Sequence, residues 1–174
     1  MMFFEIMLCV FTLFLVTMLS GCERTEQKDK VVDVIAKDNG KNIQNTKKTA
    51  YLTFDDGPSC LTEKYLDILE SEGVKATFFV IGQQINGEEQ TIKREISQGH
   101  EIGVHTYCHE ADRIYCNCDT YYKDVIKVKN ILKKQFGYDA GLVRFPWGSA
   151  NTYISSYRDN IIQRFKNIGL EYAD

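Results

Sequence analysis

Blocks of apolar and polar residues alternate along the chain beyond residue 49 and predict a repeated strand–helix pattern. Short apolar, β-branched runs predict buried strands, whereas apolar residues spaced three and four apart predict amphipathic helices. The strands are expected at 50–54, 76–81, 101–105, 142–145 and 170–173, and the helices at 61–72, 88–98, 121–136 and 153–168. Such β–α units predict a mainly parallel α/β sheet with right-handed crossovers.

Local signals mark where these helices begin and end. Gly99 and Gly137 are expected to end two of them, and Ser149 or Asn151 is expected to cap the last. The spacing in the helix at 61–72 gathers several apolar residues on one face: Leu61, Tyr65, Ile68 and Leu69.

Two carboxylates follow the first predicted strand. Asp55 and Asp56 end that apolar run, and Gly57-Pro58 stops it. Adjacent side chains on an extended backbone point in opposite directions, so we expect the two carboxylates to do different jobs. One can bind a cation while the other handles protons.

Two imidazoles follow the third predicted strand. His105 and His109 are four residues apart, a spacing that one helical turn or a tight loop brings together. With Asp56 they offer one oxygen and two nitrogen ligands, and catalytic zinc sites keep three protein ligands and an open position. A water bound there would be the nucleophile, so the pattern predicts metal-assisted hydrolysis.

Each segment also has a simpler interpretation. Asp-Gly-Pro is a common turn signal, and a His-x3-His pair alone is more often structural than catalytic. A structural zinc site of His105, His109, Cys116 and Cys118 is a further alternative. It lacks a Cys-x2-Cys spacing and leaves both carboxylates unexplained.

A third segment, at 144–148, makes the pattern specific. The motifs are Thr-Phe-Asp-Asp-Gly-Pro at 53–58, His-Thr-Tyr-Cys-His at 105–109 and Arg-Phe-Pro-Trp-Gly at 144–148. Together they resemble the motifs of the polysaccharide deacetylase family, the NodB-homology carbohydrate esterases. The stretch 74–82 also looks like the family's second strand, and the resemblance covers 49–174.

The resemblance implies a distorted (β/α) barrel that is incomplete at the C-terminus. Family members continue into an Asp-containing fourth motif and a Leu-x-His fifth motif, whose imidazole is the general acid, whereas this chain ends at Asp174. His100 is not expected to replace that acid, because the five extended residues to His105 span on the order of 16 Å. Five strands are not expected to close a barrel, so open edges are predicted.

The resemblance also implies a role for each motif residue. Asp55 would be the general base, and Arg144 would be the partner that holds its carboxylate. The backbone N–H of Trp147 would donate to the substrate carbonyl. The implied ligands of a divalent metal, with zinc expected, are Asp56, His105 and His109, and the implied substrate contacts are Tyr107, Pro146 and Trp147.

The implied activity is removal of N-acetyl groups from N-acetylglucosamine-containing polysaccharide, with peptidoglycan the expected target. Two alternatives remain open. The chain can be a truncated, inactive relative acting as a metal- or glycan-binding envelope lipoprotein, or a fragment whose remaining strands are encoded separately.

The N-terminal segment predicts export. Residues 6–20 form an apolar run of signal-peptide length, shorter than the roughly 20 residues of a membrane span. Residues 19–22 resemble a lipobox, which implies cleavage before Cys22 and a lipid on its sulfur. Residues 1–5 lack Lys and Arg, so an uncleaved anchor or a plain signal peptide remains open. Residues 23–48 are mostly polar and predict a tether to a domain at 49–174.

Charge and cysteine content refine the prediction. A net charge of −3 and a pI near 5.7 argue against nucleic-acid binding. An exported protein can form disulfides, but spacing does not give the pairing of the cysteines beyond the leader: Cys60, Cys108, Cys116 and Cys118. The expected location is the bacterial envelope, as a membrane-anchored lipoprotein or a secreted protein.

Overall fold

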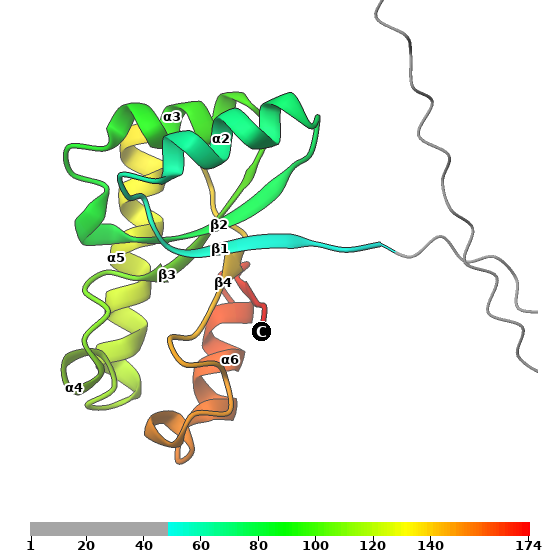
Figure 1. Cartoon of the computed structure of the whole chain (residues 1–174). Helices are drawn as coiled ribbons and strands as arrows, with labels where there is room; N and C mark the ends of the chain where they lie inside the picture. Colours follow the sequence, from blue (N-terminus) through cyan, green and yellow to red (C-terminus); the bar gives the residue numbers. More distant parts are fainter. Residues whose placement is uncertain (1–48) are drawn as a thin grey trace, which may run out of the picture. The chain divides into compact units, whose positions relative to one another are not determined.

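The computed structural model describes residues 49–174, which form a five-stranded, all-parallel sheet (Figure 1). The strand order is β1-β2-β3-β4-β5, so each strand pairs with its neighbours in sequence. The strands are β1 (Leu52–Gly57), β2 (Ala76–Ile81), β3 (Glu101–Thr106), β4 (Leu142–Val143) and β5 (Glu171–Tyr172). This confirms the predicted parallel α/β fold. The first strand extends through both carboxylates, and the last two are shorter than expected.

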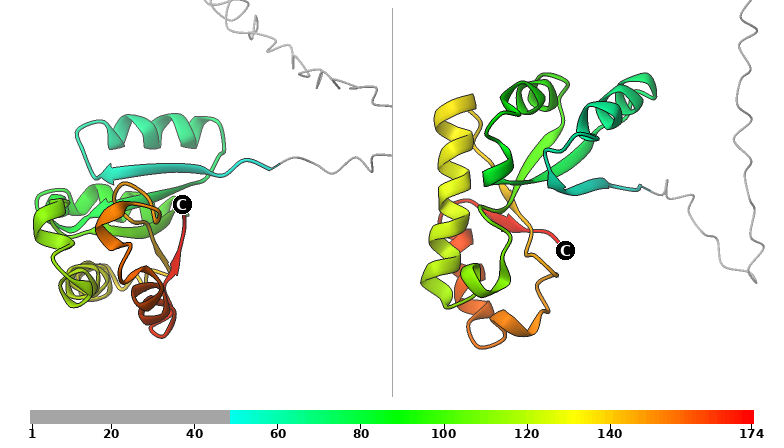
Figure 2. Two further views of the ribbon diagram at one scale, coloured as in Figure 1. Left: turned by 90° about the horizontal axis from the view of Figure 1, so that it is seen from below. Right: turned by 60° about the vertical axis from the view of Figure 1, so that its left-hand side comes forward.

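Helices connect the strands as predicted, with some extra short elements. The α-helices are α2 (Thr62–Ser71), α3 (Glu89–Ser97), α4 (Ala111–Ile114), α5 (Cys118–Phe136) and α6 (Arg158–Lys166). Two 3-10 helices, η1 (Gly82–Gln84) and η2 (Thr152–Ile154), follow β2 and β4. Helices α2 and α3 lie next to each other, and α5 packs against β3 and α6 (Figure 2).

Side-chain caps decide where α5 and η2 begin. The Asn117 Oδ1 accepts the Thr120 N–H at 2.9 Å, which starts α5 three residues earlier than expected, and Gly137 ends it at φ 67°. The Asn151 Oδ1 caps η2 by accepting the Ile154 N–H. The single helix predicted at 153–168 is wrong. The chain leaves helical geometry at Tyr157, where φ is −136°, before α6 starts.

The apolar face predicted for α2 is not its buried face. Leu69 is buried, but Leu61, Tyr65 and Ile68 are exposed. The residues that pack inward are Thr62, Leu66 and Leu69. Leu69 thus belongs to both faces, and with Leu66, three residues earlier, it forms the stripe that faces the core.

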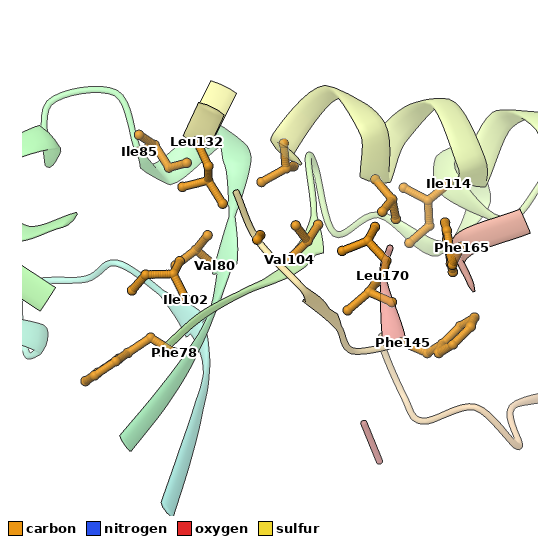
Figure 3. Packing of buried hydrophobic residues seen from close by; sticks show 14 of the residues in the cluster. Phe78, Val80, Ile85, Ile102, Val104, Ile114, Leu132, Phe145, Phe165 and Leu170 are labelled. Carbon is orange, nitrogen blue, oxygen red and sulfur yellow. The ribbon is translucent and has the colours of Figure 1, made fainter. Parts of the chain in front are cut away.

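A continuous apolar core fills the space between the sheet and the helices (Figure 3). It includes Phe78 and Val80 from β2, Ile102 and Val104 from β3, and Leu132 from α5. Gly103 allows β3 to approach β2 closely, because a Cβ at this position would lie 2.4 Å from the Phe79 ring. At the amino end of the same strands, the buried His100 accepts the Ala76 N–H through Nδ1.

The sheet curls, so that one side chain reaches both of its edge strands. The Arg144 Nε donates to the Ala173 carbonyl just after β5 at 3.2 Å. Its Nη1 donates to Thr53 and Asp55 on β1, each at 2.9 Å. This curvature suits the open barrel that the sequence predicts.

Several predictions concern parts of the chain outside the described residues. They are the signal peptide at 1–22, the lipidated Cys22 and the polar tether at 23–48. Within residues 49–174, the structure contains no helix long and apolar enough to span a membrane.

Candidate metal and catalytic site

Three side chains, one from β1 and two from β3 and the loop that follows it, converge at the carboxyl end of the sheet. The Asp56 Oδ1 lies 3.3 Å from the Nε2 atoms of both His105 and His109. One potential ligand atom from each residue falls within 4.8 Å of the other two. The structure therefore brings together the three residues that the sequence nominates as metal ligands.

The tautomer of His105 is set by a backbone contact. Its Nδ1 lies 2.8 Å from the Arg144 carbonyl oxygen, which can only accept a hydrogen bond. Nδ1 therefore carries the proton, and Nε2 keeps a lone pair on the side of Asp56. Burial lowers the pKa of His105, which favours the neutral ring that metals bind.

Two residues of the cluster have left-handed backbone conformations. Asp56 has φ 62° and His109 has φ 52°, values that are uncommon outside glycine and frequent at functional sites. The His109 N–H donates to the Thr106 Oγ1 at 3.0 Å, which holds the loop in this geometry. The local chain is therefore bent to present these two side chains.

The predicted opposite orientation of Asp55 and Asp56 is wrong. Both carboxylates line the same pocket, of about 540 Å³. The positive φ of Asp56 and a register shift between Asp55 and Gly57 break the alternation of an ideal strand. The two residues still have different partners, because Asp55 pairs with Arg144 at 2.9 Å and Asp56 faces the imidazoles.

Arg144 is placed by packing as well as by charge. Its guanidinium carbon lies 4.2 Å from the centroid of the Phe79 ring. The side chain is only 15% exposed, whereas that of Asp55 is 39% exposed. The guanidinium is thus a fixed support for a carboxylate that remains open to the pocket.

Trp147 lies on the rim of this pocket. Its backbone has φ 60°, and its ring centroid lies 4.9 Å from that of His109. The same pocket includes Asp174, which sequence reasoning missed. The Asp174 carboxylate accepts hydrogen bonds from the backbone N–H and the hydroxyl of Ser149. Its position directly after the last predicted strand, like that of Asp55 and Asp56 after the first, is the sequence signal that could have identified it.

Tyr107 and Pro146, the other predicted substrate contacts, do not line this pocket. The Asp124 carboxylate accepts the Tyr107 N–H at 2.6 Å, and the Tyr107 ring lies 3.2 Å from the Lys127 Nζ. The backbone and the ring of Tyr107 thus both contact α5. Pro146 is buried, and its carbonyl accepts the Tyr115 hydroxyl.

The alternative structural zinc site is not assembled. The Cys118 Sγ donates to Asn160 Oδ1 at 3.2 Å, and the Cys116 Sγ donates to the Asp112 carbonyl. Neither thiol joins the two histidines in the candidate metal group. Among residues 49–174, the cysteines at 60, 108, 116 and 118 form no disulfide with one another.

Fold and site together define a class of protein: a curled parallel α/β sheet with a carboxylate–imidazole cluster and a separate carboxylate at its strand ends. Comparison with protein-family models assigns the chain to a particular family. The model of the family described as polysaccharide deacetylase matches residues 42–173. The chain belongs to the polysaccharide deacetylase family.

Individual relatives agree with this assignment. The chain is 39% identical over 114 residues to the putative polysaccharide deacetylase YheN of Bacillus subtilis, covering 66% of this chain and 40% of YheN. It is 33% identical over 125 residues to a peptidoglycan-N-acetylglucosamine deacetylase of Bacillus cereus, covering 72% of this chain and 44% of that protein. The chain therefore spans less than half the length of these relatives.

A solved structure confirms the fold class. The catalytic domain of a peptidoglycan N-acetylglucosamine deacetylase from Eubacterium rectale superposes with a TM-score of 0.66 at 36% identity. The match covers 71% of this chain and 58% of that one. The fold is thus of the NodB-homology (β/α) barrel type.

Proposed function

We propose that this chain forms the active site of a metal-dependent deacetylase that removes N-acetyl groups from N-acetylglucosamine-containing polysaccharide, with peptidoglycan as its target. The observation that carries the proposal is the separation of the two aspartates. Asp56 faces two imidazoles, whereas Asp55 is held by Arg144 in the same pocket. The names of the Bacillus cereus and Eubacterium rectale proteins support the choice of substrate.

The ligand set fits a divalent metal, and zinc is the expected ion. One carboxylate and two imidazoles are hard-to-borderline donors, and the His105 Nδ1–H bond to the Arg144 carbonyl is the outer support that metal-binding histidines usually have. A bound zinc would supply Lewis acidity, which polarises a carbonyl and lowers the pKa of water.

The residues around that position divide the work of amide hydrolysis. Asp55 accepts a proton from the attacking water, because its carboxylate is open to the pocket and pairs with Arg144 rather than with an imidazole. The same carboxyl then returns this proton to the nitrogen of the leaving amine as the C–N bond breaks. Arg144 keeps that carboxylate in place. The backbone N–H of Trp147, on the rim of the pocket, donates to the acetamide oxygen as negative charge develops on that oxygen.

The proposal extends to location. Export followed by lipidation at Cys22 would place the domain at the envelope, where peptidoglycan lies, with residues 23–48 as the tether. The names of the peptidoglycan deacetylases among its relatives support this location. Replacing Cys22 with Ser should release the protein from membranes, and unchanged partitioning would contradict the lipid anchor.

The test compares acetate release by the full chain and by Asp55→Asn. Zinc-loaded protein is incubated with N-acetylglucosamine oligomers and with peptidoglycan, and bound zinc is measured in each sample. We expect Asp55→Asn to lose about 10²- to 10⁴-fold in rate while zinc content is unchanged.

The matched control is Asp112→Asn, because the Asp112 side chain is exposed and outside the pocket. It should release acetate at the wild-type rate. Equal rates for Asp55→Asn and wild type would rule out the role given to Asp55. A folded, zinc-loaded wild type that releases no acetate would favour the alternative of an inactive metal- or glycan-binding relative.

A further inference from the structure

Two large aromatic side chains lie exposed beside the candidate active site. Trp147 is 55% exposed and Tyr153 is 51% exposed, values that are high for side chains of this size. Their ring centroids are 6.0 Å apart at an interplanar angle of 48°. Trp147 also touches the ring of His109, so this aromatic pair adjoins the metal ligands.

The Tyr153 ring has one covered face. It stacks on the ring of Tyr115, with centroids 5.7 Å apart and planes within 19°. Tyr115 is buried and donates its hydroxyl to the Pro146 carbonyl at 3.0 Å. Tyr153 is therefore supported from one side and open to solvent on the other.

Asn151 joins the two segments that carry the aromatic pair. Its Nδ2 donates to the carbonyls of Pro146 and Gly148, at 3.2 and 2.7 Å, on either side of Trp147. Its Oδ1 accepts the N–H of the buried Ile154, the residue after Tyr153. The relative position of the two rings is thus fixed before any ligand arrives, which reduces the entropy cost of binding.

We propose that Trp147 and Tyr153 form a second sugar subsite, which binds the pyranose ring next to the one whose acetamide enters the metal pocket. The inference rests on the proposed function. Exposed aromatic faces offer apolar surface to the C–H groups of a sugar ring, and the Tyr153 hydroxyl can bond to its polar edge. The preferred ligand is then a β-linked N-acetylglucosamine chain of at least two sugars rather than the monosaccharide.

The choice of occupant follows from the surroundings. The aromatic pair adjoins the pocket that holds the two aspartates, the two histidines and Arg144, and Trp147 itself lines that pocket. An N-acetylated sugar chain is the occupant that follows from the proposed function, because the neighbouring sugar of the same chain carries the acetamide that enters this pocket. The rigid support of both rings also suits a stiff polysaccharide better than an adaptable peptide surface.

The chain provides its own reporter, because Trp147 is its only tryptophan. The experiment follows the fluorescence of the zinc-loaded full chain during titration with N-acetylglucosamine monomer, dimer and tetramer. All proteins carry Asp55→Asn to suppress turnover. We expect affinity to rise about tenfold from monomer to dimer, corresponding to burial of roughly 50 Å² of apolar surface.

Variants assign this gain to Tyr153. Tyr153→Ala should lose the gain from monomer to dimer, and Tyr153→Phe should retain most of it because the ring face remains. Tyr51→Ala is the matched control, since Tyr51 is 88% exposed and precedes β1 at the end away from Asp55. Tyr51→Ala should keep the full gain in affinity from monomer to dimer.

Three results would overturn the proposal: equal affinity for monomer and dimer, an undiminished gain in Tyr153→Ala, or an equal loss in Tyr51→Ala. None of them depends on catalysis. Length-dependent binding without acetate release would support the subsite while refuting the enzymatic activity. Acetate release without length-dependent binding would support the enzymatic activity while refuting the subsite.

Discussion

Replacing Glu95 with Gln should remove a pH dependence of stability that the structure builds into α3. Glu95 has no exposed surface, and neither of its carboxylate oxygens has a hydrogen-bond partner among the described residues. Burial raises the pKa of Glu95 from 4.5 to about 8, and the nearby Glu63 carboxylate adds to this shift. At neutral pH the folded protein therefore keeps this carboxyl protonated.

The sign follows from comparing the two states. Below pH 4.5 both folded and unfolded chains bind the proton, so the pKa shift has no effect on stability. As pH rises above 4.5, the Glu95 carboxyl ionises in the unfolded chain but not yet in the folded one, and this lowers the free energy of the unfolded state relative to the folded state. At about 1.4 kcal/mol per pH unit, the free energy of unfolding of wild type falls on the order of 3 kcal/mol by pH 7. The loss is complete above about pH 8, where the folded state also ionises.

The assay is urea unfolding followed by circular dichroism at several pH values between 4.5 and 8. The difference in free energy of unfolding between Glu95→Gln and wild type should grow with pH in favour of the variant. Glu72→Gln serves as the control, because Glu72 is exposed at the C-terminal end of α2. A difference for Glu95→Gln that stays constant with pH would refute the reasoning.

Two further substitutions test the packing behind the site. Arg144→Met should lower the free energy of unfolding by about 2 kcal/mol, because the hydrogen bonds to Asp55, Thr53 and Ala173 are lost. Urea unfolding measures this, and wild-type stability would contradict it. Gly103→Ala should cost about 1–3 kcal/mol, since the new Cβ meets the Phe79 ring at 2.4 Å. Gly141→Ala, where a Cβ meets no described atom within 4 Å, should be close to neutral in the same assay.

Sequence patterns predicted the sheet and the group of three candidate metal ligands because both depend on local signals. The strand at 76–81 has the predicted bounds, since its apolar run is interrupted only by the β-branched Thr77 and lies between Lys75 and Gly82. Asp56, His105 and His109 meet because parallel strands bring their carboxyl ends to one edge. Spacing and topology were sufficient for these features.

Other features depend on contacts that no local pattern encodes. Alternation gave the wrong direction for Asp56, because it assumes extended backbone and Asp56 has φ 62°. Tyr107 does not line the pocket, and its ring packs against Lys127 of α5, a contact that the sequence pattern does not encode. Tyr153 lies in η2, which is separate from α6, and the helical spacing at 153–168 did not predict this break.

The most direct test of the account is the metal dependence of acetate release. The full chain is treated with a chelator, its fold is checked by circular dichroism, and acetate release from N-acetylglucosamine oligomers is measured before and after zinc is returned. The account predicts a folded but silent chelated protein and restored release with one zinc per chain, lost again in His109→Ala. Undiminished release by the metal-free protein, or by His109→Ala, would contradict it.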